Sequence, residues 1–189
     1  MSTRTVLQEA DIARALTRIS HEILESNRGA EGLVILGIPT RGVELGQRIA
    51  ALIAGISGVE VPVGALDVTM YRDDLGRHPT RTPQPTSIPD GGIDGRVVVL
   101  VDDVLFSGRS IRSALDALQD VGRPAAVRLA TLIDRGHREL PIRPDFVGKN
   151  LPSAKSERIN VRLLQTDGVE EVTIESADGE SAEASERAP

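Results

Sequence analysis

The sequence has no cysteine and no tryptophan, and tyrosine and phenylalanine together supply only three of its 189 residues. Without cysteine, the chain can form neither a disulfide framework nor a thiolate metal site. With three aromatic rings, it has no platform on which a series of single-stranded bases could stack.

Long apolar runs are also absent. The longest, 32–38 and 97–101, are far too short to span a bilayer, and residues 1–12 lack the basic start and apolar stretch of a secretory signal. We expect a cytoplasmic protein without a membrane partner. With 40% hydrophobic and 26% charged residues, the composition is typical of one globular domain with a core.

The negative net charge is concentrated at one end of the chain. The net charge of −6 comes from 22 basic and 28 acidic residues, and the segment 167–189 holds 8 acids but only one base. That leaves 20 acids and 21 bases, a net charge of +1, for residues 1–166. The small, polar, acidic end at 176–189 is predicted to be a disordered tail after a domain at 1–175. The near-neutral body does not exclude nucleic acid as a partner.

Hydrophobic periodicity predicts alternating helices and strands, which is typical of an α/β fold with a parallel sheet. Two stretches break the pattern: a segment at 72–95 rich in proline and glycine, and the segment 136–152. The expected helices are 11–27, 42–54 and 110–120, and the expected strands are 33–38, 61–69, 96–101, 125–133 and 159–164.

Polar residues with phosphate chemistry follow the most apolar strand. Asp102 and Asp103 end that strand, and the turn 107–110, Ser-Gly-Arg-Ser, opens a helix. Such a turn offers backbone N–H groups, two hydroxyls and a guanidinium to a phosphate, and the two carboxylates can accept hydrogen bonds from ribose hydroxyls. A phosphate-loop NTPase would also use paired acids, but its Gly-x-x-x-x-Gly-Lys-Ser/Thr motif is missing. A helix N-cap with incidental acids is the simpler alternative.

The segment 98–110 resembles the phosphoribosyl-pyrophosphate (PRPP) motif of type I phosphoribosyltransferases. Within that family, the strings 37–42, 69–75, 134–141 and 146–150 resemble those of pyrimidine operon regulators with uracil phosphoribosyltransferase activity. The resemblance covers about 10–163. It implies the type I phosphoribosyltransferase fold, a central, mostly parallel sheet flanked by helices, with a small hood at about 134–158 and a flexible lid at about 70–95.

The resemblance also implies site residues. Arg72, Asp102 and Asp103 would be catalytic, and Mg²⁺ would arrive with PRPP rather than in a protein site. The base of uracil, or of the nucleotide UMP, would meet Arg135, Phe146, Val147 and Gly148. The residues implied to contact PRPP are Thr40, Arg41, Arg72, Asp102, Asp103, Val104, Leu105, Phe106, Ser107, Gly108, Arg109 and Ser110.

The implied reaction is the displacement of pyrophosphate from carbon 1 of PRPP by nitrogen 1 of uracil, which gives UMP. The segment 144–148 is also similar to the base-pocket string of hypoxanthine-guanine phosphoribosyltransferases, so the base could instead be a purine. The string at 135–141, Arg-Gly-His-Arg-Glu-Leu-Pro, favours the pyrimidine regulators.

A second implied activity is UMP-dependent binding to the leader of pyrimidine (pyr) operon messenger RNA. The segment 17–22 resembles the stretch that the family uses in contacting RNA, and basic residues recur along one stripe of the first helix. A solvated helix face is the ordinary explanation of such a stripe, and a plain phosphoribosyltransferase without RNA binding is the alternative. A homodimer or a higher homo-oligomer is expected from the family. The RNA-contact candidates are Arg14, Thr17, Arg18, His21, Arg143 and Lys155.

Overall fold

The computed structural model describes residues 2–73 and 84–176. Part of the expected lid, 74–83, and the expected tail beyond Ser176 lie outside the described residues.

A five-stranded parallel sheet forms the centre of the fold, in the order β3-β2-β4-β5-β6. The adjacent central strands β2 and β4 have no polar side chain over most of their length, which suits strands covered on both faces. The strands are β2 (Leu33–Gly37), β3 (Val63–Ala65), β4 (Val97–Leu105), β5 (Ala126–Asp134) and β6 (Phe146–Asn150). The predicted α/β architecture with a parallel sheet is confirmed.

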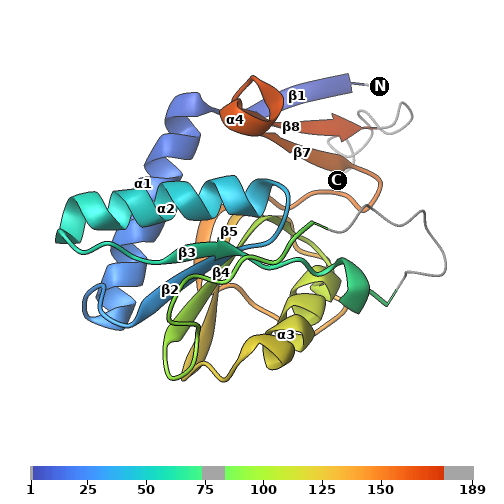
Figure 1. Ribbon diagram of the computed structural model, residues 1–189. Coiled ribbons are helices and arrows are strands. Elements are labelled where there is room, and N and C mark those ends of the chain that lie inside the picture. Colours follow the sequence, from blue (N-terminus) through green and yellow to red (C-terminus); the bar gives the residue numbers. More distant parts are fainter. Residues whose placement is uncertain (1, 74–83, 177–189) are drawn as a thin grey trace, which may run out of the picture.

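Helices cover both faces of this sheet (Figure 1). Successive side chains of a strand point to opposite faces, so β2 contributes Leu33 and Ile35 to one core cluster and Val34 and Leu36 to the other. Helices α1 (Glu9–Asn27) and α2 (Arg41–Ser57) pack on the first cluster, and α3 (Arg109–Val121) packs on the second. No helix in the described ranges is long and apolar enough to cross a membrane.

A second, antiparallel sheet joins the two ends of the described chain, in the order β1-β8-β7 (Figure 1). It consists of β1 (Ser2–Gln8), β7 (Arg158–Arg162) and β8 (Glu171–Ser176), with the short helix α4 (Leu164–Asp167) between β7 and β8. Leu7, Val161 and Val172 bury their side chains in the same cluster as α1 and α2. The second sheet is therefore part of one domain.

The small hood expected at 134–158 does not coincide with this second sheet. Within that range, Asp134 ends β5, β6 pairs with β5 in the central sheet, Arg158 begins β7, and the remaining residues form loops. The layer that stands apart from the central sheet is instead built from 2–8 and 158–176. This layer includes both ends of the described chain, because β1 and β8 pair with each other across almost its whole length.

Several predicted elements end at other residues than expected. The strand predicted at 96–101 continues through both aspartates to Leu105, because β5 runs beside it as far as Asp134. The strand predicted at 61–69 is reduced to β3, followed by a 3₁₀ turn, η1 (Thr69–Tyr71). The strands β1, β6 and β8 are absent from the prediction.

Candidate active site

The carboxyl end of β4 presents the two aspartates. Asp102 is 8% exposed and Asp103 is half-buried. Each carboxylate accepts a hydrogen bond from the next backbone N–H: Asp103 N donates to Asp102 Oδ1 at 2.9 Å, and Val104 N donates to Asp103 Oδ1 at 2.8 Å. These bonds fix the carboxylates against the strand. An ionised carboxylate has about four lone-pair sites with which it can accept hydrogen bonds.

The turn that follows β4 leads directly into α3. Gly108 adopts φ +92°, a conformation that side chains rarely tolerate, and α3 begins at the next residue. The loop after β5 supports the turn from behind, because Glu139 N and Leu140 N both donate to the carbonyl oxygen of Ser107, at 3.0 and 3.2 Å. The turn thus ends at a helix N-terminus, where the first N–H groups have no carbonyl partner within the helix and Arg109 N donates to Ser107 Oγ at 3.3 Å. A helix N-terminus of this kind is an arrangement that binds phosphates.

The side chain of Arg109 is already engaged by two carboxylates. Its Nη1 donates to Asp73 Oδ2 at 2.5 Å and its Nε donates to Glu139 Oε2 at 2.7 Å. Hydrogen bonds to Glu139 and then to Asp73 raise the pKa of Arg109. A phosphate at this turn would therefore meet mainly backbone N–H groups and the hydroxyls of Ser107 and Ser110.

Two glycines bring the start of α2 against β4. A Cβ on Gly42 would lie 2.4 Å from the carbonyl oxygen of Val101, and a Cβ on Gly37 would lie 2.4 Å from the carbonyl oxygen of Gly42. Larger residues would push these segments apart. Thr40 and Arg41 are consequently held at the same sheet edge as Asp102, as predicted for neighbouring parallel strands.

Arg41 makes a bidentate ion pair with Asp167 of α4. Its Nε and Nη2 donate to Asp167 Oδ2 and Oδ1 at 2.9 and 2.7 Å. The hydrogen bond with Asp167 raises the pKa of Arg41, and the same bond lowers the pKa of Asp167. The pair ties the start of α2 to the second sheet.

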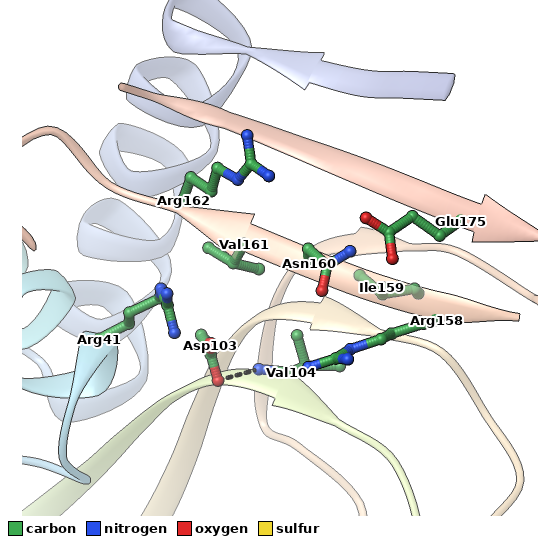
Figure 2. Close-up of a pocket in the computed structure, with 9 residues that line it drawn as sticks. All are labelled: Arg41, Asp103, Val104, Arg158, Ile159, Asn160, Val161, Arg162 and Glu175. Carbon is green, nitrogen blue, oxygen red and sulfur yellow. Dashed lines mark hydrogen bonds between the residues drawn. The ribbon is translucent and has the colours of Figure 1, made fainter. Parts of the chain in front are cut away.

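A cavity of about 410 Å³ lies between this sheet edge and the second sheet (Figure 2). On one side it is lined by Arg41, Asp103 and Val104, and on the other by the whole of β7 and by Glu175. The sequence did not identify β7 or Glu175 as part of the site. The alternation of Arg158, Asn160 and Arg162 with apolar residues was the available signal, since it gives this strand a polar face.

Arg135 and Phe106 meet beside the paired aspartates. The Arg135 guanidinium carbon lies 4.4 Å from the centre of the Phe106 ring, and the His137 ring meets the same ring edge-on. Arg135 Nη2 also donates to the carbonyl oxygens of Ala154 and Glu157, at 2.8 and 3.0 Å. Arg135 is only 7% exposed, and burial lowers its pKa. This stack of the Arg135 guanidinium over the Phe106 ring thus links the turn after β4 to the loop 154–157.

The other three residues implied to meet the base do not join this stack. Phe146 is 5% exposed and packs in the core cluster that lies under α1, so its ring faces the interior instead of the cavity. The carbonyl oxygens of Val147 and Gly148 accept hydrogen bonds from Arg18, at 3.0 and 2.5 Å. The implied lining of the site by the Phe146 ring is therefore corrected to a core position, which a single apolar residue on a buried strand usually occupies.

Arg72 is exposed and follows η1 directly, between two anchored neighbours. The Tyr71 hydroxyl donates to Asp120 Oδ2 on α3 at 2.5 Å, which raises the pKa of Tyr71. Asp73 accepts the hydrogen bond from Arg109. These two contacts hold the backbone of Arg72 close to α3 and to the turn at its N-terminus.

The RNA-contact candidates on α1 are all exposed, but they are not equally available. Thr17 Oγ1 donates to the carbonyl of Ala13, and Arg14 pairs with Asp11 at 2.5 Å. Arg18 donates hydrogen bonds to the carboxylate of Glu22 and to the carbonyl oxygens of Val147 and Gly148 on β6. The remaining candidates, His21 on α1 and Arg143 and Lys155 in loops, are exposed.

The contacts of Arg18 lead to a stability prediction. Arg18→Ala should lower the free energy of unfolding by about 1 kcal/mol, because it removes two hydrogen bonds that join α1 to the edge strand β6. Arg14→Ala, which loses only an exposed pair within α1, should cost less than about 0.5 kcal/mol. Urea unfolding of both variants tests this, and equal losses would contradict it.

The donor set at this edge fits a cation that arrives with its ligand. Among the described residues, no three histidine, aspartate or glutamate side chains gather into a group that could hold a metal ion. Asp102 and Asp103 could complete the coordination of Mg²⁺ bound to a pyrophosphate, since Mg²⁺ in such sites is held by one or two carboxylates, substrate phosphates and water.

Comparisons with known proteins give the family. The model of the phosphoribosyl transferase domain matches residues 2–166. A protein of Leifsonia xyli subsp. xyli named Bifunctional protein PyrR is 73% identical over 180 residues, which cover 93% of this chain and 98% of that protein. A protein of Streptomyces coelicolor with the same name is 61% identical over 171 residues, which cover 90% and 89%.

Solved structures with the same fold are more distant in sequence. The hypoxanthine phosphoribosyltransferase of Trypanosoma cruzi superposes with a TM-score of 0.68 at 16% identity, over 90% of this chain and 95% of that chain. That of Staphylococcus aureus gives 0.64 at 20% identity, over 82% and 79%. From the domain match, the high identities and the shared fold, the chain belongs to the phosphoribosyltransferase family and, within it, to the bifunctional PyrR proteins.

Proposed function

We propose that this protein transfers the phosphoribosyl group of PRPP to uracil, giving UMP and pyrophosphate, and that it also regulates pyrimidine biosynthesis by binding pyr messenger RNA in the presence of UMP. The observation that carries the catalytic part is the convergence of Asp102, Asp103, the Gly108 turn and Arg41 around one sheet edge beside the cavity. The regulatory part rests on membership among the bifunctional PyrR proteins.

Each part of PRPP has a partner of suitable chemistry at this edge. The 5-phosphate fits the turn between β4 and α3, where N–H groups and hydroxyls are concentrated. The ribose hydroxyls fit the carboxylates of Asp102 and Asp103, which accept hydrogen bonds. The pyrophosphate fits Arg41 and Arg72, and the Mg²⁺ that it carries would offset charge on its oxygens.

The protein's contribution to the reaction is positioning and electrostatic stabilisation. As the bond from carbon 1 to pyrophosphate breaks, the ribose gains oxocarbenium character, which the negative charges of Asp102 and Asp103 stabilise. Arg41 and Arg72 stabilise the charge that develops on the leaving pyrophosphate. Nitrogen 1 of uracil attacks carbon 1 as the bond to pyrophosphate breaks, and its proton passes to water or to the leaving pyrophosphate. No side chain has to act as a nucleophile.

The base is proposed to lie near the stack of Arg135 on Phe106. This stack adjoins the aspartates, because the Arg135 backbone N–H donates to the carbonyl of Leu105 at the end of β4. A flat guanidinium on an aromatic ring offers a planar surface of the size of a pyrimidine. Val147 lies two strands away from Asp102 at the same register, because Thr131 of β5 pairs with both of them.

One incubation distinguishes the pyrimidine from the purine base. Wild-type protein with PRPP, Mg²⁺ and uracil should release pyrophosphate and form UMP, whereas hypoxanthine in place of uracil should give no nucleotide. The hypoxanthine phosphoribosyltransferases among the solved structures share less than 25% identity with this chain. Their similarity therefore supports the fold and is no evidence that this protein uses a purine base. IMP formation without UMP formation would overturn the proposal.

RNA binding should depend strongly on salt, because it would rest on cations meeting phosphates and on RNA shape. In a filter-binding titration with the pyr leader and UMP, Arg14→Ala should lower the slope of log K against log salt concentration by about 1. Arg123→Ala, an exposed arginine in the loop between α3 and β5, serves as the control and should leave the slope unchanged. An unchanged slope for Arg14→Ala would remove α1 from the proposed RNA surface.

A homo-oligomeric state and a cytoplasmic location remain predictions from the sequence and the family. Equilibrium sedimentation of the wild-type protein tests the first directly.

A further inference from the structure

We infer that Asp167 is a positioning residue for phosphoribosyl transfer: through its ion pair with Arg41, it fixes the guanidinium that faces the cavity, so that the second sheet determines the geometry of the pyrophosphate site. The inference rests on the proposed function. It adds a residue from α4, an element that the sequence did not connect with the site.

The ion pair leaves part of Arg41 available for an anion. A guanidinium has five N–H donors in a rigid plane, and Asp167 takes one from Nε and one from Nη2. The two donors of Nη1 and the second donor of Nη2 remain. Arg41 lines the cavity, and Figure 2 shows its guanidinium beside Asp103 at the same end of that cavity. Two fixed hydrogen bonds thus orient the donors that remain.

Asp167 is itself held in place. Its Oδ2 accepts a hydrogen bond from the Leu163 backbone N–H at 2.9 Å, in addition to the bond from Arg41. The carboxylate therefore has bonds to its own segment and to α2, and its side chain is only 19% exposed. A side chain fixed in this way can restrain a longer and more flexible partner.

Glu44 docks α4 on the same turn of α2. This glutamate is 5% exposed, and its carboxylate accepts hydrogen bonds from Gln165 N at 3.2 Å, Thr166 N at 3.1 Å and Thr166 Oγ1 at 2.7 Å. Arg41 reaches from α2 to α4 and α4 reaches back to Glu44, so the two segments hold each other at two points. The position of Arg41 is consequently coupled to the segment between β7 and β8.

The charge balance explains why Asp167 favours anion binding despite its negative charge. Arg41 keeps its positive charge with or without Asp167, because a guanidinium is not deprotonated in proteins. The hydrogen bond with Asp167 raises its pKa further. Without Asp167, the guanidinium would be free to swing toward Asp103, whose charge also attracts it. A pyrophosphate would then have to displace that contact and order the side chain, which costs binding energy.

A neighbouring ion pair supplies a matched control. Arg48 Nη1 lies 2.7 Å from Glu170 Oε1, so this pair also joins α2 to the segment that follows β7. Neither residue lines the cavity. Glu170→Gln therefore removes the charge from a second ion pair between the same two segments without touching Arg41.

The test compares Asp167→Asn and Glu170→Gln with the wild type in steady-state kinetics, together with calorimetric titrations of Mg²⁺–PRPP and of UMP. Asp167→Asn should raise the KM and the Kd for PRPP about tenfold and leave the KM for uracil and the Kd for UMP, which lacks pyrophosphate, within about twofold. Glu170→Gln should leave both KM values, for PRPP and for uracil, and both Kd values, for PRPP and for UMP, within about twofold of the wild type. Thermal unfolding of both variants reports any loss of stability separately.

Two outcomes would overturn the inference: a PRPP affinity of Asp167→Asn within about twofold of the wild type, or an equal loss in Glu170→Gln. In the background Arg41→Gln, adding Asp167→Asn should weaken PRPP binding no further, and an additional tenfold loss would show that Asp167 does not act through Arg41. A wild-type protein that binds PRPP but makes no UMP would overturn the proposed function, while the titrations would still decide the role of Asp167.

Discussion

Asp102→Asn is expected to lower kcat/KM for UMP formation by about 100- to 1,000-fold, the range found when a preorganised group that stabilises charge in a transition state is removed. Asparagine has nearly the same shape, and its Oδ1 can still accept the hydrogen bond from the Asp103 backbone N–H. The substitution therefore removes the negative charge next to the ribose and preserves the end of β4. Initial rates with uracil and PRPP measure the effect.

Asp116→Asn is the control for this substitution. Asp116 lies on α3, and its salt bridge with Arg112 is an exposed pair at 3.7 Å. The control should keep wild-type kinetics, and the thermal unfolding temperature of Asp102→Asn should stay close to that of the wild type. A variant Asp102→Asn that retains most of the activity would show that the ribose is not held by this carboxylate.

Arg72→Ala should lower kcat about 100-fold and leave the Kd for UMP unchanged. Pyrophosphate carries the developing negative charge in the transition state, and UMP has no pyrophosphate, so only the reaction should depend on this guanidinium. The anchored neighbours Tyr71 and Asp73 should keep the backbone in place after the substitution. Kinetics and a calorimetric titration with UMP measure the two quantities.

Met70→Ala serves as the local control, because Met70 is 66% exposed on η1, the 3₁₀ turn that directly precedes Arg72. This control should change neither kcat nor the Kd for UMP. Parallel losses of turnover and of UMP affinity in Arg72→Ala would mean that Arg72 supports the general shape of the site instead of the leaving group.

The central part of the fold could be predicted because its signals are local. The helix α1 and the strands β2 and β4 have clear periods or continuous apolar runs, and both core clusters follow from alternation along β2. The strands β1 and β8 pair with each other at positions as distant as Ser2 and Ser176. The segment of β1 contains mostly polar residues and gives no strand signal. The segment of β8 has only a short alternation of polar residues with Val172 and Ile174 before the polar, acidic chain end.

The candidate site likewise has a part that local sequence signals predict and a part that depends on distant segments. Asp102, Asp103 and the Gly108 turn follow each other in the sequence, so a motif identifies them, and the structure brings Arg41 to their side through the close packing at Gly42. The partners that hold these residues come from elsewhere: Asp167 holds Arg41, and Asp73 and Glu139 hold Arg109. Such pairs depend on tertiary packing, which a single sequence does not report.

Phe146 and Arg18 show how a neighbouring element can determine what a side chain contacts. A strand residue has two possible faces, and Phe146 points to the face covered by α1. Arg18 lies on the expected exposed stripe, but the nearby edge of β6 offers it two carbonyl oxygens. In both cases a neighbouring element determines the contacts of the side chain, and the sequence did not place the two elements next to each other.

The most direct test of the account is UMP formation by the wild-type protein and by the double variant Asp102→Asn/Asp103→Asn, assayed with uracil, PRPP and Mg²⁺. The account predicts that the wild type forms one UMP for each pyrophosphate released and that the folded double variant forms almost none. No UMP from the wild type, or wild-type rates from the double variant, would contradict phosphoribosyl transfer at the carboxyl end of β4.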